Sequence, residues 1–432
     1  MICENLSVSP EGRLLFAGQD LRRLADKYAT PMYLMDEDRI RFNCRRYQSA
    51  LREAFGENTL PLYAGKACAF KRMYQIIAEE KMGIEVVSGG EIYTAKKAGV
   101  DLTNGYFNGN NKTDDEIAFA MQSGVGYFVV DNEEEIFAIS RIGKAQNVEQ
   151  KILLRITPGI DTHTYEEIRT GQVDSKFGSA IETGQAMAIT KTALAAPNVI
   201  LSGFHCHVGS QLFDSDTFLR SAQIMFSFLA SVRSETGFIA SQLSLGGGWG
   251  VRYSEQDPVA DLGANILQIG DCVHSLCETL SYPTPKILME PGRSIVADAG
   301  LTLYSVGTVK RIPGYKNYVS VNGGMTDNPR FALYKAVHTP VLCEKMNEEN
   351  DMVCSVVGRC CESGDILCEG VSLPSSVKRG DLLAILTTGA YNYSMASHYN
   401  RVLKLPVIML SGGKDYVAVR RETYEDLTAC DL

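Results

Sequence analysis

From residue 36 to residue 295, the spacing of apolar positions alternates between two periods. Short apolar runs bounded by turn residues predict eight β-strands, at 60–63, 84–87, 105–107, 127–130, 152–157, 201–205, 242–245 and 286–289. Stretches with a helical period lie between them, among them 69–81, 90–98, 113–122, 132–142 and 217–236. Eight strand–helix units in about 250 residues are typical of a closed (β/α)8 barrel. A doubly wound open sheet is the alternative, because alternation alone does not show that a sheet closes.

After residue 296 the pattern changes to strands with little helical periodicity. The predicted strands are 301–310, 318–321, 351–357, 381–386 and 416–421. Near the N-terminus, 14–16 is also strand-like. We therefore expect a TIM-like (β/α)8 barrel over 36–295, and a C-terminal β-sandwich or β-barrel domain over 296–432 that residues 1–35 complete.

Composition narrows the class of protein. A chain of 432 residues suits two or three domains, or a barrel with a partner domain. A net charge of −9 argues against a nucleic-acid or anionic-membrane surface. The sequence contains neither an apolar run of ~18 residues nor an N-terminal signal pattern. Twelve cysteines without a C-x-x-C pair are then expected to be free thiols in the cytoplasm.

Lys66 is the first candidate for chemistry. It follows the apolar strand 60–63, at the carboxyl end where barrel enzymes place their active sites. Partial desolvation lowers the pKa of a lysine, and a neutral amine can form a Schiff base with an aldehyde. The alternative is a strand-end lysine whose amine reaches water.

Two later segments indicate an anion site. Gly246, Gly247 and Gly248 follow the strand 242–245, and three glycines let backbone N–H groups converge on an anion. Arg293 follows the last strand and offers a charge-assisted donor. A packing turn and a surface ion pair are the alternatives. Barrels often hold phosphate after strands seven and eight, so we favour phosphate.

The remaining polar residues at strand ends complete a recognisable set. His205 and His207 share one face of a strand, but no cysteine or carboxylate cluster nearby completes a metal site. A histidine there could instead stack on a flat aromatic ligand. Glu290 could pair with a protonated ring nitrogen, although capping or ion pairing is the alternative. Together with Lys66 and the glycines, these residues predict a site for pyridoxal 5'-phosphate.

These segments resemble those of the fold-type III pyridoxal-phosphate-dependent amino acid decarboxylases, over nearly the whole chain. Residues 63–67 (Tyr-Ala-Gly-Lys-Ala) resemble the Schiff-base segment, and 207–210 (His-Val-Gly-Ser) resemble the segment that stacks on the ring and meets the phosphate. Residues 246–248 and 290–293 resemble the phosphate and pyridinium segments. The resemblance implies that the cofactor contacts are Lys66, His207, Ser210, Gly246, Gly247, Gly248, Glu290, Gly292, Arg293 and Tyr391.

The second half resembles the subfamily that converts meso-2,6-diaminopimelate into L-lysine and CO2, the last step of lysine biosynthesis. The matching segments are 328–334 (Asn-Pro-Arg-Phe-Ala-Leu-Tyr), 361–365 (Cys-Glu-Ser-Gly-Asp) and 389–395 (Gly-Ala-Tyr-Asn-Tyr-Ser-Met). This resemblance implies a carboxy-lyase with Lys66 as cofactor anchor and Cys361 as proton donor. The implied substrate contacts are Arg293, Arg330, Tyr334, Glu362 and Tyr391. It also implies a homodimer, in which Cys361 and Glu362 enter the neighbouring subunit's active site.

Charge supports this choice of substrate. The distal end of diaminopimelate carries a carboxylate and an ammonium. Arg330 can bind the carboxylate with its planar fork, and Glu362 can accept a hydrogen bond from the ammonium. An ornithine enzyme would need no arginine there.

The chain departs from the family at Cys68, where asparagine is usual, and at 358–360 (Gly-Arg-Cys), where Gly-Pro-x is usual. Cys360 therefore adjoins Cys361, although the register of the motif favours Cys361. Arg155, His163 and Lys176 lie near the fifth strand without an assignable role.

Other functions stay open at this stage. The chain could decarboxylate another basic amino acid, or it could be a pyridoxal-phosphate racemase, which would need a tyrosine base opposite Lys66. A non-catalytic cofactor carrier and a metal-dependent barrel hydrolase are alternatives from other classes. Release of CO2 from diaminopimelate, compared with ornithine, arginine and lysine, would separate them.

Overall fold

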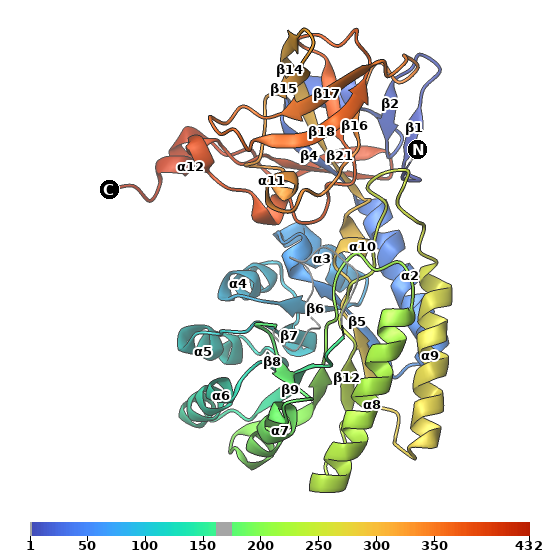
Figure 1. Cartoon of the computed structure of the whole chain (residues 1–432). Coiled ribbons are helices and arrows are strands. Elements are labelled where there is room, and N and C mark those ends of the chain that lie inside the picture. Colours follow the sequence, from blue (N-terminus) through green and yellow to red (C-terminus); the bar gives the residue numbers. More distant parts are fainter. Residues whose placement is uncertain (1, 161–174) are drawn as a thin grey trace. The chain divides into compact units, whose positions relative to one another are not determined.

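The computed structural model describes residues 2–160 and 175–432, and their contacts form two compact units (Figure 1). The barrel unit comprises Asn43–Gly250 and Ala260–Gly292. The sheet unit comprises Met1–Phe42, Val251–Val259 and Arg293–Leu432. No helix in the described ranges is both long enough and apolar enough to cross a lipid bilayer.

Eight parallel strands close the barrel. They are β5 (Thr59–Ala64), β6 (Gly83–Val86), β7 (Gly105–Phe107), β8 (Tyr127–Val130), β9 (Gln150–Thr157), β11 (Val199–His205), β12 (Gln242–Ser244) and β13 (Lys286–Met289). Each pairs with the next, and pairing of β13 with β5 completes the ring. A short strand, β10 (Ser179–Ala180), lies beside β9. The predicted (β/α)8 barrel is confirmed, and the open sheet is excluded.

Helices follow the strands and surround them (Figure 1). They are α3 (Lys71–Glu79), α4 (Gly89–Lys97), α5 (Asp114–Gln122), α6 (Glu133–Gln146), α7 (Gln185–Ala195), α8 (Asp216–Thr236) and α9 (Leu262–Thr279), with α2 (Glu37–Phe55) before β5 and two 3₁₀ turns, η1 (Gly65–Ala67) and η2 (Leu102–Asn104). Side-chain caps fix several starts: Ser88 caps α4, Thr113 forms a capping box at α5, and Asn132 caps α6. The five predicted helices are all present.

Alternation along the strands determines which side chains meet inside the barrel. One interior layer consists of Leu62, Tyr106, Val129, Leu153 and Leu288. Because side chains on a strand alternate between faces, the residue two positions later also points inward, nearer the carboxyl end. The residues at or just beyond the strand ends in that phase are Ala64, Glu85, Asn108, Asp131, Arg155, His205, Ser244 and Glu290. The barrel mouth is therefore polar above an apolar interior.

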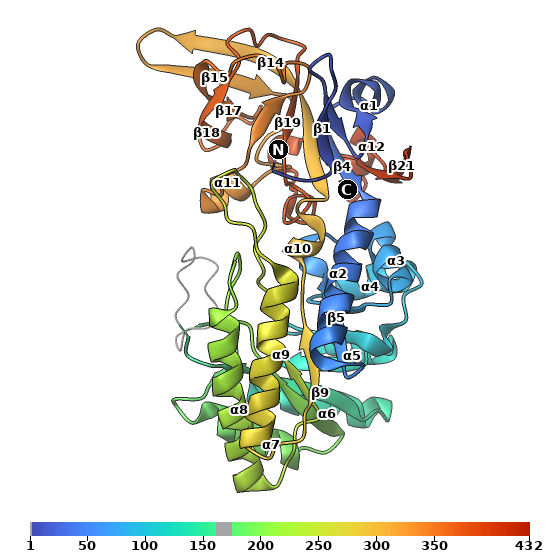
Figure 2. The same ribbon diagram turned by 90° about the vertical axis from the view of Figure 1, so that its right-hand side faces the viewer.

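The sheet unit contains a nine-stranded sheet and a smaller one (Figure 2). The large sheet comprises β4 (Met32–Asp36), β14 (Gly300–Ile312), β15 (Lys316–Val321), β16 (Pro340–Leu342), β17 (Met352–Val357), β18 (Ile366–Leu373), β19 (Leu382–Ile385), β20 (Val407–Ser411) and β21 (Lys414–Val419). The small sheet comprises β1 (Leu6–Val8), β2 (Leu14–Phe16) and β3 (Gln19–Asp20). The short helices of this unit are α1 (Leu21–Tyr28), α10 (Arg293–Val296), α11 (Arg330–Tyr334), α12 (Tyr424–Thr428), η4 (Tyr393–Met395) and η5 (Tyr399–Arg401).

The N-terminal segment completes the large sheet, as expected. Strand β4 pairs antiparallel with β14 and parallel with β20, so it lies inside the sheet rather than at an edge. All five of its side chains are buried, which hides the two-residue alternation that marks a half-buried strand. In this unit the sequence pattern predicted β2, β14, β15, β17, β19 and β21. It did not predict β4, nor β1, β3, β16, β18 and β20.

Candidate active site

Lys66 lies at the barrel mouth, in the turn η1 directly after β5. Its Nζ is 3.6 Å from Oε1 of Glu85 on β6, and its side chain is 43% exposed. Glu85 is buried; its Oε1 accepts from Asn108 Nδ2 at 2.8 Å, and its Oε2 is buried without a hydrogen-bond partner. The amine is thus accessible from solvent and lies beside a buried carboxylate.

Glu290, directly after β13, is held by side chains at the ends of β12 and β11. Ser244 Oγ donates to Oε1 at 2.6 Å, and His205 Nε2 lies 3.0 Å from Oε2. Burial by itself would raise the pKa of Glu290, but His205, the Ser244 hydroxyl and Lys66 outweigh burial and hold the pKa below its ordinary value. This residue is therefore a fixed carboxylate anion, suited to accept from a protonated nitrogen.

The segment Gly246–Gly248 follows β12, where the chain passes close to other backbone. A Cβ on Gly247 would lie 2.1 Å from the carbonyl oxygen of Glu290, and Gly246 and Gly248 adopt φ of +71° and +133°. The segment therefore requires glycine at each position. It also fixes His207, whose Nδ1 accepts from the Gly247 N–H at 3.3 Å.

His207 presents an uncharged ring. Burial, reinforced by the positive charges of Lys66 and Arg155, holds the pKa of His207 well below its ordinary value. A neutral imidazole is a flat surface on which an aromatic ligand can stack.

Ser210, three residues later, is half-buried in the same loop, between Gly209 (φ +151°) and Gln211 (φ +64°). Gly292 packs against β5, where a Cβ would lie 3.0 Å from that of Ala64.

Arg155 proves to be part of the mouth. Its guanidinium lies 4.4 Å from the centre of the Phe177 ring. Burial lowers its pKa, while Asp131, Glu85 and Glu290 oppose that effect electrostatically. Arg155 thus adds a cation among the carboxylates. Lys176 Nζ also lies near the Phe177 ring, 5.0 Å from its centre. His163 falls outside the described residues.

The sheet unit brings two of the predicted arginines together around Tyr253. Arg293 Nη1 donates to the Tyr253 hydroxyl at 2.6 Å, and Arg330 Cζ lies 4.6 Å from the centre of that ring. Arg330 Nη1 is 3.2 Å from His338 Nε2. We call Arg293, Arg330, Tyr253 and His338 the arginine cluster. Burial would raise the pKa of Tyr253, but the two arginines outweigh burial and lower it.

Two predicted tyrosines adjoin the cluster. Arg293 Cζ lies 4.8 Å from the centre of the Tyr391 ring, and Tyr391 has a left-handed backbone with φ of +59°. Tyr334, on α11 with Arg330, interacts electrostatically with Arg293. Buried guanidinium groups among hydroxyl groups can bind a carboxylate or a phosphate.

Cys361 and Glu362 lie in an exposed loop of the sheet unit. The Asp365 carboxylate anchors the loop, accepting from the N–H groups of Cys360 at 2.7 Å and Met325 at 2.6 Å. The Cys361 N–H donates to Asn400 Oδ1 at 2.8 Å. Among the described residues, no hydrogen bond or ion pair joins Cys361 or Glu362 to the arginine cluster. Burial and Asp365 raise the pKa of the Cys360 thiol to about 11.

The barrel mouth fits pyridoxal phosphate. It offers an accessible amine for the aldehyde, a fixed carboxylate for the ring nitrogen and a glycine segment for the phosphate. Two buried polar atoms without partners, Glu85 Oε2 and His205 Nδ1, lie among these groups. Buried polar atoms usually have a hydrogen-bond partner in folded proteins, and a polar ligand at the mouth would supply one here.

The sequence did not predict five residues of the barrel mouth and the arginine cluster: Glu85, Asn108, Ser244, Tyr253 and His338. The first three carry a usable signal, because each is a polar residue in the inward phase at or just beyond the end of a barrel strand. Within residues 2–160 and 175–432, no group of three or more histidine, cysteine or carboxylate side chains could hold a metal ion.

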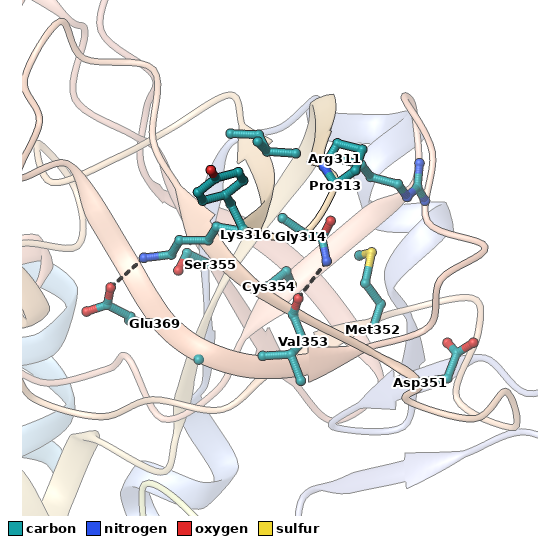
Figure 3. Close-up of a pocket in the computed structure, with 14 residues that line it drawn as sticks. Arg311, Pro313, Gly314, Lys316, Asp351, Met352, Val353, Cys354, Ser355 and Glu369 are labelled. Atoms are coloured by element: carbon teal, nitrogen blue, oxygen red, sulfur yellow. Dashed lines mark hydrogen bonds and ion pairs between the residues drawn. The ribbon is translucent and has the colours of Figure 1, made fainter.

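A surface groove of about 750 Å³ lies at the β14–β15 hairpin (Figure 3). None of the predicted site residues lines it. Lys316 pairs with Glu369 at 2.7 Å, and Asn317 Nδ2 donates to the Val353 carbonyl at 3.0 Å. With these groups already paired, the groove gives no evidence of a catalytic site.

Comparisons with known proteins agree with this geometry. Residues 37–297 match the family described as "Pyridoxal-dependent decarboxylase, pyridoxal binding domain". The chain is 41% identical to diaminopimelate decarboxylase of Bacillus subtilis, covering 98% of this chain and 95% of that protein. It is 42% identical to that of Staphylococcus aureus, covering 97% and 98%. The crystal structure of the M. jannaschii enzyme in complex with L-lysine superposes with a TM-score of 0.91, at 33% identity, covering 100% of this chain and 98% of that one.

Proposed function

Because this chain belongs to the diaminopimelate decarboxylase family of pyridoxal-dependent decarboxylases, we propose that it converts meso-2,6-diaminopimelate into L-lysine and CO2, the last step of lysine biosynthesis. The protein is a carboxy-lyase whose cofactor is pyridoxal 5'-phosphate. Since the product has the L configuration, the carboxylate that leaves comes from the D centre of the substrate. The carboxylate of the L centre remains and must be recognised.

The observation that carries the proposal is the meeting of Lys66, Glu290 and Gly246–Gly248 at one barrel mouth. When bound, pyridoxal phosphate supplies an electron sink for the pair left by loss of CO2. We assign Lys66 to the aldehyde, and Glu290 to the ring nitrogen, where its lowered pKa keeps it an acceptor. Neutral His207 would support the ring face. The remaining cofactor contacts are assigned to Ser210, Gly246, Gly247, Gly248, Gly292, Arg293 and Tyr391, with the serine, the glycine segment and the arginine at the phosphate.

Arg330 has the properties of a carboxylate receptor. Its side chain is buried, and no described carboxylate pairs with it; its neighbours are His338, Tyr253 and Arg293. A buried charge is stable only with a partner of opposite sign, so the L-centre carboxylate would complete this environment. Glu362 would accept from the L-centre ammonium. The remaining substrate contacts are assigned to Arg293, Tyr334 and Tyr391.

Cys361 is the proposed proton donor. Its thiol is exposed, so it can reach a ligand. The Asp365 and Asn400 contacts hold the N–H groups of Cys360 and of Cys361 itself. Delivery of a proton from Sγ to the α-carbon would contribute ~10²–10⁴ in rate, the usual range for a positioned acid.

The same proposal extends to assembly and location. The barrel over 36–295 would bind the cofactor, and residues 1–35 and 296–432 would contribute substrate and interface residues. The exposed Cys361–Glu362 loop suits a homodimer in which each chain completes its partner's active site. All twelve cysteines are unpaired, as in cytoplasmic proteins.

Substitution of Lys66 tests the proposal. Purified protein should show a visible absorption band from bound cofactor and release CO2 from meso-diaminopimelate, but not from ornithine, arginine or lysine at comparable rates. Lys66→Ala should abolish both signals, while Lys71→Ala, an exposed lysine five residues away, should preserve both. A Lys66→Ala protein that keeps the band and the CO2 release would overturn the assignment, and racemisation without CO2 would identify a different enzyme.

A further inference from the structure

We propose that His338 is a positioning residue that holds the Arg330 guanidinium ready for the L-centre carboxylate. This inference rests on the proposed function, since it assigns Arg330 to that carboxylate. Neither the motifs nor the strand periodicity pointed to His338. The contacts of its two ring nitrogens carry the argument.

The hydrogen-bond partners of His338 fix its tautomer. Nδ1 lies 3.1 Å from the carbonyl oxygen of Leu386, which can only accept, so Nδ1 carries the proton. Nε2 then presents a lone pair, and it accepts from Arg330 Nη1 at 3.2 Å. Burial, with the nearby charge of Arg330, lowers the pKa of His338 to about 3, so the ring stays neutral at physiological pH. A neutral acceptor can orient an arginine without cancelling its charge.

Tyr253 restrains the same guanidinium from another side. The centre of the Tyr253 ring lies 4.6 Å from Arg330 Cζ. The same ring packs edge-on against the His338 ring, with the two centroids 4.8 Å apart and the planes at 76°. Thr339, next to His338, donates from Oγ1 to the Tyr253 carbonyl oxygen at 2.7 Å. Arg330 therefore lies over one ring and donates to another, and both contacts restrict its side chain before any ligand arrives.

This arrangement leaves the fork of Arg330 available. Arg330 donates from Nη1 to His338 and also hydrogen-bonds the Tyr253 side chain, which leaves further N–H groups among the five of a guanidinium. These remaining N–H groups are the donors that a carboxylate would use. If His338 could not accept, Arg330 would lose its fixed direction, and affinity for the carboxylate would fall while the rest of the site stayed intact.

L-lysine and cadaverine form a matched pair of probes, because they differ only in this carboxylate. Inhibition constants for both should be measured against meso-diaminopimelate with the holoenzyme. His338→Phe keeps a ring but has no acceptor. We expect it to weaken L-lysine at least tenfold and to change cadaverine less than twofold. KM for meso-diaminopimelate should rise about tenfold, with kcat within threefold of the parent.

Two further variants make the result decisive. His338→Gln supplies an amide oxygen near the Nε2 position and should recover most of the L-lysine affinity. His274→Phe, on α9 of the barrel unit, controls for a histidine-to-phenylalanine change elsewhere and should leave both constants unchanged. Equal weakening of both ligands by His338→Phe, or no weakening, would overturn the inference.

Arg330→Met separates this inference from the function on which it rests. If Arg330→Met removes the preference for L-lysine over cadaverine but His338→Phe does not, only the positioning role fails. If Arg330→Met leaves the preference intact, the proposed carboxylate site itself is wrong.

Discussion

Replacing Gly247 with alanine tests whether the glycine segment is shaped by close packing. The added Cβ would lie 2.1 Å from the Glu290 carbonyl oxygen, whereas real Cβ contacts essentially never fall below 3.0 Å. The two strand ends must therefore separate by at least 0.9 Å. The Glu290 N–H to Gly246 carbonyl bond, 2.9 Å long, would stretch to about 3.8 Å and break. Gly247 does not have a positive φ, so crowding alone causes the effect.

The expected cost of Gly247→Ala has two parts. Overpacking should lower the free energy of unfolding by ~1–3 kcal/mol, and the lost hydrogen bond by ~1 kcal/mol. Displacing Glu290 by nearly 1 Å should lower kcat/KM by about 10²-fold, because reacting groups tolerate little misplacement. Cofactor retention after dialysis, kcat/KM and thermal unfolding would measure these effects.

A second glycine provides the control. Gly263, in the first turn of α9, has no atom closer than 3.6 Å to an added Cβ. Gly263→Ala should therefore raise stability by up to about 1 kcal/mol through helix propensity and leave cofactor retention unchanged. If Gly247→Ala keeps parental stability and cofactor retention, the segment can relax without cost and the reasoning is refuted.

Two other predictions concern a buried carboxyl group and the adjacent pair of thiols. Asp327 is buried, and burial raises its pKa to about 6, although hydrogen bonds from Tyr304, Gly324 and Thr326 oppose this shift. Its contribution to stability is therefore complete below about pH 4, and it is lost as the pH rises through 6. Asp327→Asn should remove about 2 kcal/mol of the change in unfolding free energy between pH 4.5 and 7, measured by urea titration at both pH values; a parallel change in both proteins would contradict it. Cys361→Ser should lower kcat by ~10²–10⁴ while Cys360→Ser stays within threefold, and the reverse order in single-turnover assays would reassign the proton donor.

The sequence predicted the barrel because its strands alternate with helices in a regular order, and Lys66, Gly246–Gly248 and Glu290 because each directly follows a strand. Whether a residue follows the end of a strand depends only on the neighbouring sequence, so one amino-acid sequence is enough to predict it. The Glu85–Asn108 contact joins neighbouring strands 23 residues apart, and its geometry depends on register and closure. The role of His338 depends on two contacts, one of them with a carbonyl 48 residues away. Such contacts arise from tertiary packing, which periodicity does not encode.

The inward phase of the barrel strands also bears on how this enzyme can evolve. Ser244 and Glu290 each lie two positions beyond an inward-facing residue, Gln242 and Leu288 respectively. Inserting or deleting one residue within β12 or β13 would turn every later side chain to the opposite face. An insertion in β13 would place Met289, and a deletion would place Pro291, where the Glu290 carboxylate now lies. The same change in a helix or connecting loop would leave this phase untouched. Length variation among functional relatives should therefore concentrate in the helices and loops, while the strands diverge by substitution alone.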